Sequence, residues 1–224
     1  PPFNQKEWWD GSFEGDDRWK YGTPPKNNAN FAWLQHMLHH LAPNGSLGLL
    51  LANGSMSSMS GGEGGIRKAL IEADLVECML AFPGQLFTNT QIPACIWFLT
   101  KNKKAGGEFR DRSGEVLFLD VRDKGQKITR AQKVLSDDDI EEIAGTVRKW
   151  RRPDGYQDQP GFCKSVALED ISANDYILTP GRYIGTPEIE EDAISIENRM
   201  IKLSETLLSQ MDEAGKLNIE IREN

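Results

Sequence analysis

The residues Pro1-Pro2-Phe3-Asn4 have the types and the spacing to hold a flat amino group. Proline fixes φ and has no N–H, so two prolines in a row form a stiff loop that presents carbonyl acceptors without competing donors. Acceptors on both N–H bonds of an exocyclic amine localise its lone pair, which can then attack a methyl group in line. Phe3 can stack on a base that has swung out of a duplex. Taken alone, these residues are explained more simply by a Pro-Pro turn beside a buried Phe.

Composition limits the classes of protein that can carry this loop. The chain has 224 residues and a formal charge of −8, with 27% charged and 38% hydrophobic residues. That length allows one good core plus an appendage. A negative chain does not coat nucleic acid with its whole surface. Its charge is uneven, because residues 101–133 hold ten Lys or Arg against five Asp or Glu, whereas residues 188–223 hold four against ten. The basic middle can face phosphate and the acidic end a protein.

Cysteine and histidine usage predicts no disulfide framework and no metal site. The three cysteines, Cys78, Cys95 and Cys163, are far apart, and the first two sit in apolar runs where free Cys packs as a small hydrophobe. His36 and His40 are one helical turn apart, but no ligand cluster accompanies them. No apolar run reaches membrane-spanning length and no signal peptide is visible. We therefore expect a cytoplasmic protein without a membrane partner.

The hydrophobic pattern predicts alternating helices and strands. Helices are predicted at 27–41, 66–73, 136–151 and 188–215, and strands at 46–52, 75–82, 94–100 and 115–121. The continuous apolar run 46–52 is typical of a strand buried in a parallel sheet. This order predicts an α/β fold, the C-terminal half of a doubly wound Rossmann-like sheet that ends in an antiparallel hairpin, followed by an extension with a long helix. Because ligands bind at the carboxyl ends of such strands, Phe87 would share a rim with Phe3.

Three regions are predicted along the chain: residues 1–133 as part of a catalytic domain, 134–185 as a helical or irregular extension, and 186–224 as a partner-binding helix. The long helix has an apolar stripe, which either a partner helix or the chain's own domain can cover. The aromatic loop 8–21 can stack on nucleic acid or be held to the domain by its own rings. Both alternatives remain open for each segment.

Six blocks, in order along the chain, resemble the modification (M) subunit of type I restriction-modification systems. The resemblance runs from Pro1 to about Gly185, and the tail beyond it is similar only in being helical. The blocks are Pro1-Pro2-Phe3-Asn4, Trp19-Lys20-Tyr21-Gly22 with Pro24-Pro25, residues 28–36 (NANFAWLQH), Leu51-Ala52-Asn53-Gly54-Ser55, Pro83-Gly84-Gln85-Leu86-Phe87, and residues 178–183 (LTPGRY).

The resemblance implies S-adenosyl-L-methionine-dependent N6-adenine methylation of DNA, in complex with a specificity (S) subunit and, in some systems, a restriction (R) subunit. By analogy, the catalytic loop is Pro1, Pro2 and Phe3: Pro1 would offer its carbonyl to the amine, Phe3 would stack on the flipped adenine, and Phe87 would pack against the same base. The Asn that precedes Pro1 in the family, and its glycine-bearing loop for the methyl donor, are not in this sequence. We therefore expect a C-terminal part of a longer subunit that is inactive on its own, with its cofactor-binding residues upstream of Pro1.

Two other functions are compatible with the sequence. The chain can be a non-catalytic assembly module that links the specificity subunit to other parts. It can also be a protein-glutamine methyltransferase, which uses a similar Asn-Pro-Pro-aromatic loop. Those enzymes lack a long extension after the hairpin, and the basic residues between Lys101 and Lys133 favour DNA as the substrate.

Overall fold

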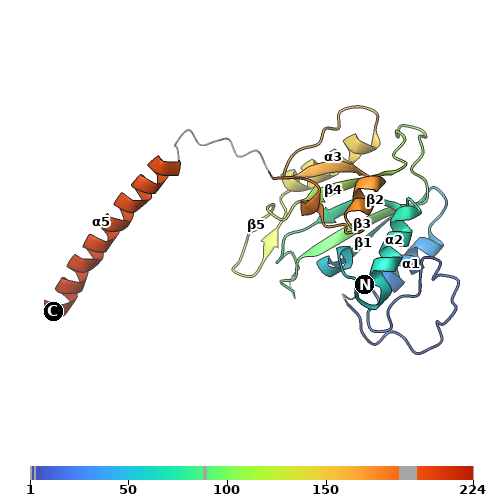
Figure 1. Cartoon of the computed structure of the whole chain (residues 1–224), viewed down its shortest axis with the longest axis horizontal. Coiled ribbons are helices and arrows are strands. Elements are labelled where there is room, and N and C mark those ends of the chain that lie inside the picture. The colour runs from blue at the N-terminus through green and yellow to red at the C-terminus, as the bar shows by residue number, and fades with distance from the viewer. Residues whose placement is uncertain (1, 3, 88–89, 187–195, 224) are drawn as a thin grey trace. The chain divides into compact units, whose positions relative to one another are not determined.

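The computed structural model describes residues 2, 4–87, 90–186 and 196–223, and divides into two compact units, Pro1–Pro187 and Glu188–Asn224 (Figure 1). The helices are α1 (Asn30–His40), α2 (Glu63–Glu72), α3 (Asp137–Arg151), α4 (Leu168–Ala173) and α5 (Ile196–Glu223), with short 3-10 helices η1 (Asn53–Met56), η2 (Ser60–Gly62) and η3 (Pro180–Arg182). The strands are β1 (Ser46–Ala52), β2 (Val76–Ala81), β3 (Ala94–Thr100), β4 (Glu115–Asp120), β5 (Gln126–Lys127), β6 (Lys133–Val134) and β7 (Cys163–Ala167).

The first unit is built on a five-stranded sheet in the order β1-β3-β2-β4-β7. β3 runs antiparallel to both β1 and β2, β2 is parallel to β4, and β7 is antiparallel to β4. In this register Ala52 faces Ala94, and Ala81 pairs with both Cys95 and Asp120. The carboxyl ends of β1, β2 and β4 therefore lie together along one side of the sheet, across the strand direction. This side is called here the carboxyl edge. The carboxyl end of β3 lies on the other side, called the opposite edge.

The predicted α/β fold and its hairpin are confirmed. Each of the eight predicted elements has a counterpart, and β2 and β3 make the expected antiparallel pair. Residues 188–195 of the predicted long helix lie outside the described residues, and α5 continues to Glu223. One expectation is wrong in detail, because the described neighbour of β1 is the antiparallel strand β3 rather than a parallel strand. β1 thus pairs with the second strand of the β2–β3 hairpin. β7 and the small β5–β6 hairpin were not predicted, because five-residue and two-residue strands carry too little alternation to register as a pattern.

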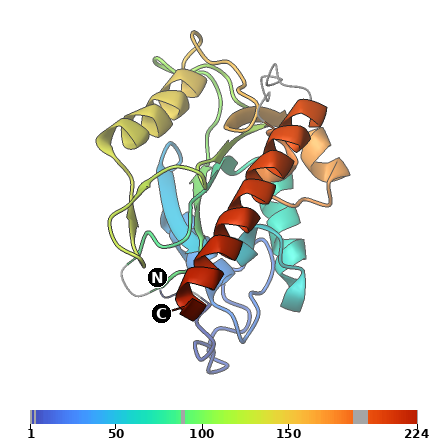
Figure 2. The ribbon, with the colours of Figure 1, turned by 90° about the vertical axis from the view of Figure 1, so that its left-hand side faces the viewer.

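Helices cover both faces of the sheet. α1, α2 and α4 pack on one face through Phe31, Leu70 and Ile171, and α3 packs on the other through Ile143 and Trp150. Figure 2 shows α3 in yellow on one side of the sheet, with α2 in cyan and α4 in orange on the other. Two apolar layers of this kind explain why the inner strands read as nearly continuous hydrophobic runs.

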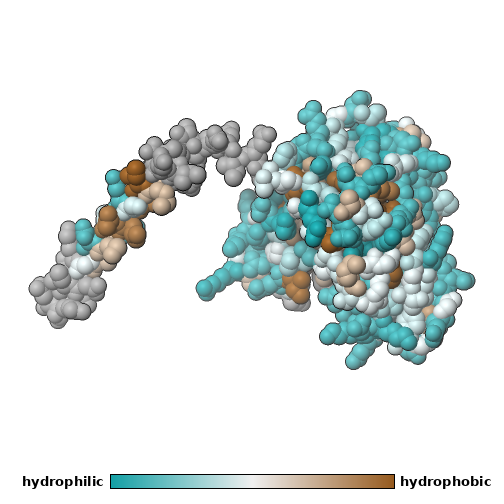
Figure 3. All heavy atoms as spheres, in the orientation of Figure 1, coloured by the Kyte–Doolittle hydropathy of each residue, from teal (hydrophilic) through white to brown (hydrophobic). Residues whose placement is uncertain are grey.

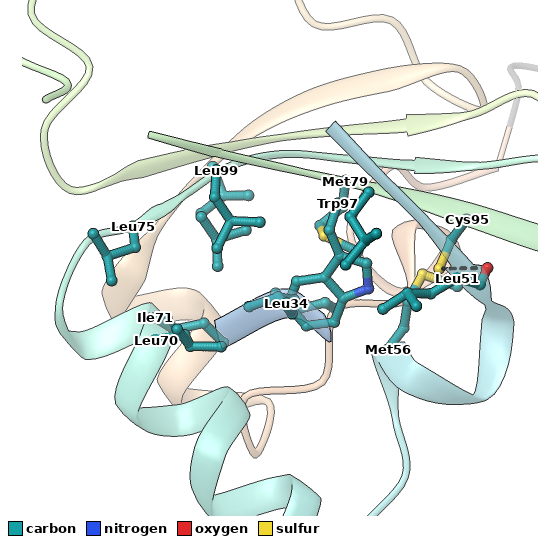
Figure 4. Packing of buried hydrophobic residues seen from close by; sticks show 14 of the residues in the cluster. Leu34, Leu51, Met56, Leu70, Ile71, Leu75, Met79, Cys95, Trp97 and Leu99 are labelled. Carbon is teal, nitrogen blue, oxygen red and sulfur yellow. Dashed lines mark hydrogen bonds between the residues drawn. The ribbon is translucent and has the colours of Figure 1, made fainter. Parts of the chain in front are cut away.

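Trp97 is, with Trp150, one of the two largest fully buried side chains among the described residues. Its ring meets Phe31 edge to face at 5.7 Å, and Figure 4 shows it beside Leu34, with Leu51 and Met56 farther along the same layer. Burying a tryptophan removes about 150–250 Å² from water, which stabilises the fold by roughly 4–6 kcal/mol relative to exposure. Met56, in the loop that follows β1, belongs to the same buried cluster as Trp97.

The second unit contains the long helix α5. Its described side chains include an apolar series that is more than half exposed: Met200, Ile201, Leu203, Leu207, Leu208 and Met211. Figure 3 shows brown and tan hydrophobic side chains at the surface along the helix. Among the described residues no helix is long and apolar enough to cross a membrane. The series repeats at helical spacing, so it forms one face of α5.

Candidate active site

The opening loop is fastened to the first turn of α1. Pro1 and Phe3 lie outside the described residues, whereas Pro2 is described and exposed. Asn4 and Asn30 exchange two hydrogen bonds: the Asn4 N–H donates to Asn30 Oδ1 at 3.1 Å, and Asn30 Nδ2 donates to Asn4 Oδ1 at 2.8 Å. The N–H of Ala29 donates to the carbonyl of Gln5 at 3.0 Å. The loop thus satisfies backbone groups that a helix start leaves open.

This anchor places Asn4 toward the carboxyl edge. α1 is followed by a short loop to Gly45, just before β1. The Gly45 carbonyl accepts a hydrogen bond from Thr100 Oγ1, at the end of β3, at 3.0 Å. The C-terminal end of α1 therefore lies near the opposite edge. From there the helix runs back beside β1, and Phe31 in its first turn reaches Trp97. The first residues of α1, and Asn4 with them, therefore lie toward the end of β1.

The second predicted segment, the loop from Phe82 to Pro93, also lies at the carboxyl edge. It joins β2 to β3, and the Phe82 N–H closes it by donating to the Ala94 carbonyl at 2.8 Å. Gly84 leaves no room for a side chain, because a Cβ there would lie 2.7 Å from the Gln91 carbonyl oxygen. Phe87 is half-buried and forms a β-bridge with Thr90. The edge predicted for Phe87 is the one observed, whereas its pairing with Phe3 stays a prediction.

Asn53 is a polar residue of this edge that the sequence reasoning did not single out as a site residue. It directly follows β1, and its N–H donates to the Pro93 carbonyl at 3.4 Å. Its side-chain Oδ1 is buried and has no hydrogen-bond partner among the described residues. A buried acceptor without a donor is costly and marks a position where a ligand can supply one. The available signal was a polar residue at the carboxyl end of a buried strand.

The three cysteines are not nucleophiles of this site. All are buried, as predicted for Cys78 and Cys95, and burial raises the pKa of each thiol. For Cys95, at the carboxyl edge, the pKa rises to about 11. Its Sγ donates weakly to the carbonyls of Leu51 and Ala52 at 3.6 and 3.7 Å. Because the thiolate is the reactive form, these groups act as core packing at neutral pH.

The aromatic loop 8–21 is held to its domain by its own rings, the second of the two alternatives. The indole N–H of Trp8 donates to the Pro25 carbonyl at 3.0 Å, and that of Trp19 to the Phe13 carbonyl at 2.8 Å. The ring centroids of Trp8 and Phe13 lie 5.9 Å apart in a stacked arrangement. These ring faces are therefore engaged within the loop itself.

The basic stretch 101–133 does not form one continuous face. Residues 101–112 follow β3 and lie at the opposite edge, whereas residues 122–133 follow β4 and lie at the carboxyl edge. Much of the positive charge at the opposite edge is neutralised by ion pairs, including charge on the arginines at the C-terminal end of α3. Ion pairs there join Lys103 to Asp74, Arg110 to Glu115, Arg112 and Arg151 to Glu77, and Arg152 to Glu108. Residues 122–133 are thus the part of the basic middle that lies at the carboxyl edge.

His36 and His40 lie together on α1 with ring centroids 4.6 Å apart. The Arg18 guanidinium lies 3.0 Å from His36 Nδ1. Burial lowers the pKa of His36, and electrostatic repulsion from its neighbours, Arg18 among them, lowers it further. No group of three or more potential ligands that could hold a metal ion occurs in the described part of the chain.

Comparison with known proteins identifies relatives of this chain. The profile of the N-6 DNA methylase family matches residues 1–192. The HindI type I restriction enzyme methylase subunit of Haemophilus influenzae is 56% identical over 224 residues, covering 100% of this chain and 49% of the relative. The MjaIX methylase subunit of Methanocaldococcus jannaschii is 38% identical, covering 100% of this chain and 40% of the relative. The chain thus spans about half the length of these relatives.

Solved structures agree with the sequence relatives. A type I restriction-modification methyltransferase subunit from Streptococcus thermophilus superposes with a TM-score of 0.70 at 30% identity, covering 83% of this chain and 37% of the other. The EcoKI M protein superposes with a TM-score of 0.57 at 14% identity, covering 88% of this chain and 46% of the other, which shows a shared fold alone.

Proposed function

Because this chain belongs to the N-6 DNA methylase family and is homologous to type I methylase subunits, we propose that it takes part in the methylation of adenine N6 in DNA. The observation that supports the proposal is the Asn4–Asn30 anchor, which holds Asn4, the residue after the Pro-Pro-Phe segment in the sequence, toward the edge that also holds the Phe87 loop. Two loops that converge at the carboxyl ends of strands are the usual setting of a ligand site in an α/β sheet.

In this proposal the residues of the opening loop hold the adenine. The carbonyl of Pro1 accepts from the exocyclic amine, and the rings of Phe3 and Phe87 hold the base outside the duplex. Pro2 keeps the loop rigid, since its fixed φ and missing N–H leave it few other conformations. The chemistry assigned to these residues is therefore orientation of the amine and exclusion of water.

The methyl donor proposed is S-adenosyl-L-methionine, which supplies an electrophilic methyl group when bound. We assign no contact with this methyl donor to the described residues. The residues that bind it are proposed to lie in a part of the subunit outside this chain. Two observations support this: the chain spans 49% of the HindI subunit, and β1, at the end of the sheet order, has a described neighbour on one side only. A further strand can pair with that open side. On this proposal the chain alone is inactive.

The proposed partner of α5 is the specificity subunit, which would read the DNA sequence. The exposed apolar face of α5 is the supporting observation, because an unpaired apolar stripe on a long helix is the usual form of a helix-docking surface. A restriction subunit is a further proposed member of the complex, and the cytoplasm the proposed location.

The test is methyl transfer by the complete methylase subunit, with and without its specificity subunit. Duplex DNA and S-adenosyl-L-methionine labelled in the methyl group are supplied, and the DNA is digested to nucleosides. We expect label in N6-methyladenine only when both subunits are present. Label in protein glutamine would instead indicate the protein methyltransferase function, and an unlabelled but assembled complex would indicate an assembly module.

A further inference from the structure

A small basic hairpin stands at the carboxyl edge and touches the Phe87 loop. It comprises residues 122–134, in which β5 and β6 pair antiparallel. The N–H of Lys133 donates to the carbonyl of Gln85 at 2.8 Å, two residues before Phe87. Figure 1 shows β5 at the end of a hairpin that extends from the body of the first unit. The candidate site and the hairpin are therefore neighbours through a direct backbone bond.

The charges of the hairpin fall into two groups. At its base, Arg122 pairs with Asp120 at 2.5 Å, and Lys124 pairs with Glu142 of α3 at 2.5 Å. These acids fix the base of the hairpin to β4 and α3. Beyond the base, residues 125–134 contain three Lys or Arg and no Asp or Glu. The positive charges at the base of the hairpin are thus paired with acids. Those beyond the base, called here the outer charges, have no acid within residues 125–134.

The outer charges are available to a ligand. Lys127 and Arg130 are exposed and Lys133 is half-buried. None of the three takes part in an ion pair with a described residue of the chain. Residues 143–152 are also basic and free of acids, but Arg148, Arg151 and Arg152 each have an ion-pair partner, whereas the three charges of residues 125–134 have none among the described residues. A polyanion can approach a chain with a formal charge of −8 only where the local surface is positive.

We propose that the tip of this hairpin, through Lys127 and Arg130, binds the phosphate backbone of duplex DNA beside the base held at the carboxyl edge. This inference rests on the proposed function, because it takes DNA to be the substrate. Each strand of a duplex carries one phosphate charge about every 3.4 Å along the axis, so a base at the Phe87 loop brings phosphates to the adjoining hairpin. Such contacts set the position of the duplex and carry no sequence information.

The experiment measures DNA binding by the complete methylase in complex with its specificity subunit. The double variant Lys127→Gln/Arg130→Gln removes the two exposed charges of the tip. A matched double variant, Lys104→Gln/Lys149→Gln, removes two exposed charges outside the hairpin. For each protein, the affinity for a labelled duplex is measured over a series of salt concentrations, and circular dichroism checks the fold.

The salt dependence separates the outcomes. Each lost phosphate contact reduces the slope of log affinity against log salt by about 0.9, so we expect the hairpin variant to lose about 2 and the matched control to keep the wild-type slope. The loss should be equal for recognised and unrelated duplexes. A hairpin variant with the wild-type slope overturns the inference. Because binding is read without catalysis, a complex that shows the expected slopes but transfers no methyl group would count against the proposed function alone.

Discussion

The indole N–H of Trp97 donates a hydrogen bond of 3.0 Å to the hydroxyl of Ser55, and both side chains are buried. Trp97 belongs to β3 at the centre of the core, and Ser55 to the loop that follows β1. The bond therefore ties the carboxyl edge to the core. Cys95 adds to the same contact, with its Sγ 3.4 Å from the Ser55 hydroxyl.

Replacing Ser55 by Ala should destabilise the first unit. The variant leaves the buried indole N–H of Trp97 without an acceptor, which costs about 1–3 kcal/mol in the free energy of unfolding. Urea unfolding measures the change as a shift in midpoint. Ser57→Ala, at an exposed position of the same loop, should leave the midpoint unchanged. Equal midpoints for the two variants would show that the Trp97 bond contributes little.

A second stability prediction concerns the buried carboxylate of Glu77. It meets Arg151 at 2.6 Å and Arg112 at 3.3 Å, and Arg112 is itself buried. Glu77→Gln leaves the Arg112 charge without its counter-ion, so we expect a loss of about 3–5 kcal/mol. The matched variant Glu141→Gln breaks an exposed pair with Arg148 and should cost at most about 1 kcal/mol. Similar losses in the two variants would contradict this reading of the buried pair.

The capping box of α3 gives a prediction with a pH dependence. Ser136 Oγ accepts from the Asp139 N–H, and the Asp139 carboxylate accepts from the Ser136 N–H, which lowers the pKa of Asp139 below 3.8. Ser136→Ala should cost about 0.5–2 kcal/mol at neutral pH, and Ser136→Thr should restore most of it.

The carboxylate contribution has a defined pH window. Because the folded pKa of Asp139 is lowered, its stabilising effect is complete above the ordinary value of 3.8 and is lost as pH falls through the folded value. The melting temperature of Asp139→Asn should therefore lie below that of the wild type at neutral pH and approach it at lower pH. A difference that stays constant across this range would exclude the carboxylate as the cause.

Elements with long, strong patterns were predictable from the sequence. The apolar run 46–52 became β1 with the same bounds, and the helix predicted at 136–151 became α3, with Ser136 as its N-cap. The edge at which Phe87 lies was predictable because Phe87 follows the predicted strand 75–82, and a loop after such a strand lies at the carboxyl edge. Local patterns fix the elements because they record which residues must be buried.

Long-range relationships were not predictable. The Lys133–Gln85 bond and the Glu77–Arg151 pair join segments 48 and 74 residues apart, and no local pattern encodes such contacts. The division of the basic stretch between two edges depends on β3 and β4 ending at opposite ends of the sheet. Asn53 was missed for a related reason, because its unpaired Oδ1 is visible only once its neighbours are placed.

The exposed face of α5 makes a prediction about assembly. The double variant Leu203→Gln/Leu207→Gln removes two of its apolar side chains, both more than half exposed, and should abolish co-purification with the specificity subunit. Glu213→Gln, at an exposed position on the opposite face of the helix, should leave co-purification intact. Retention of the specificity subunit by the double variant would assign its binding site to another surface.

The most direct measurement of the central claim is single-turnover methyl transfer to adenine by the complete complex carrying Phe3→Ala or Phe87→Ala. Base stacking on an aromatic ring is worth about 1–3 kcal/mol, so each variant should transfer roughly 5- to 150-fold more slowly with its fold retained. Phe109→Ala, at an exposed ring beyond the opposite edge, should transfer at the wild-type rate. Wild-type rates for both Phe3→Ala and Phe87→Ala would contradict an adenine site at the carboxyl edge.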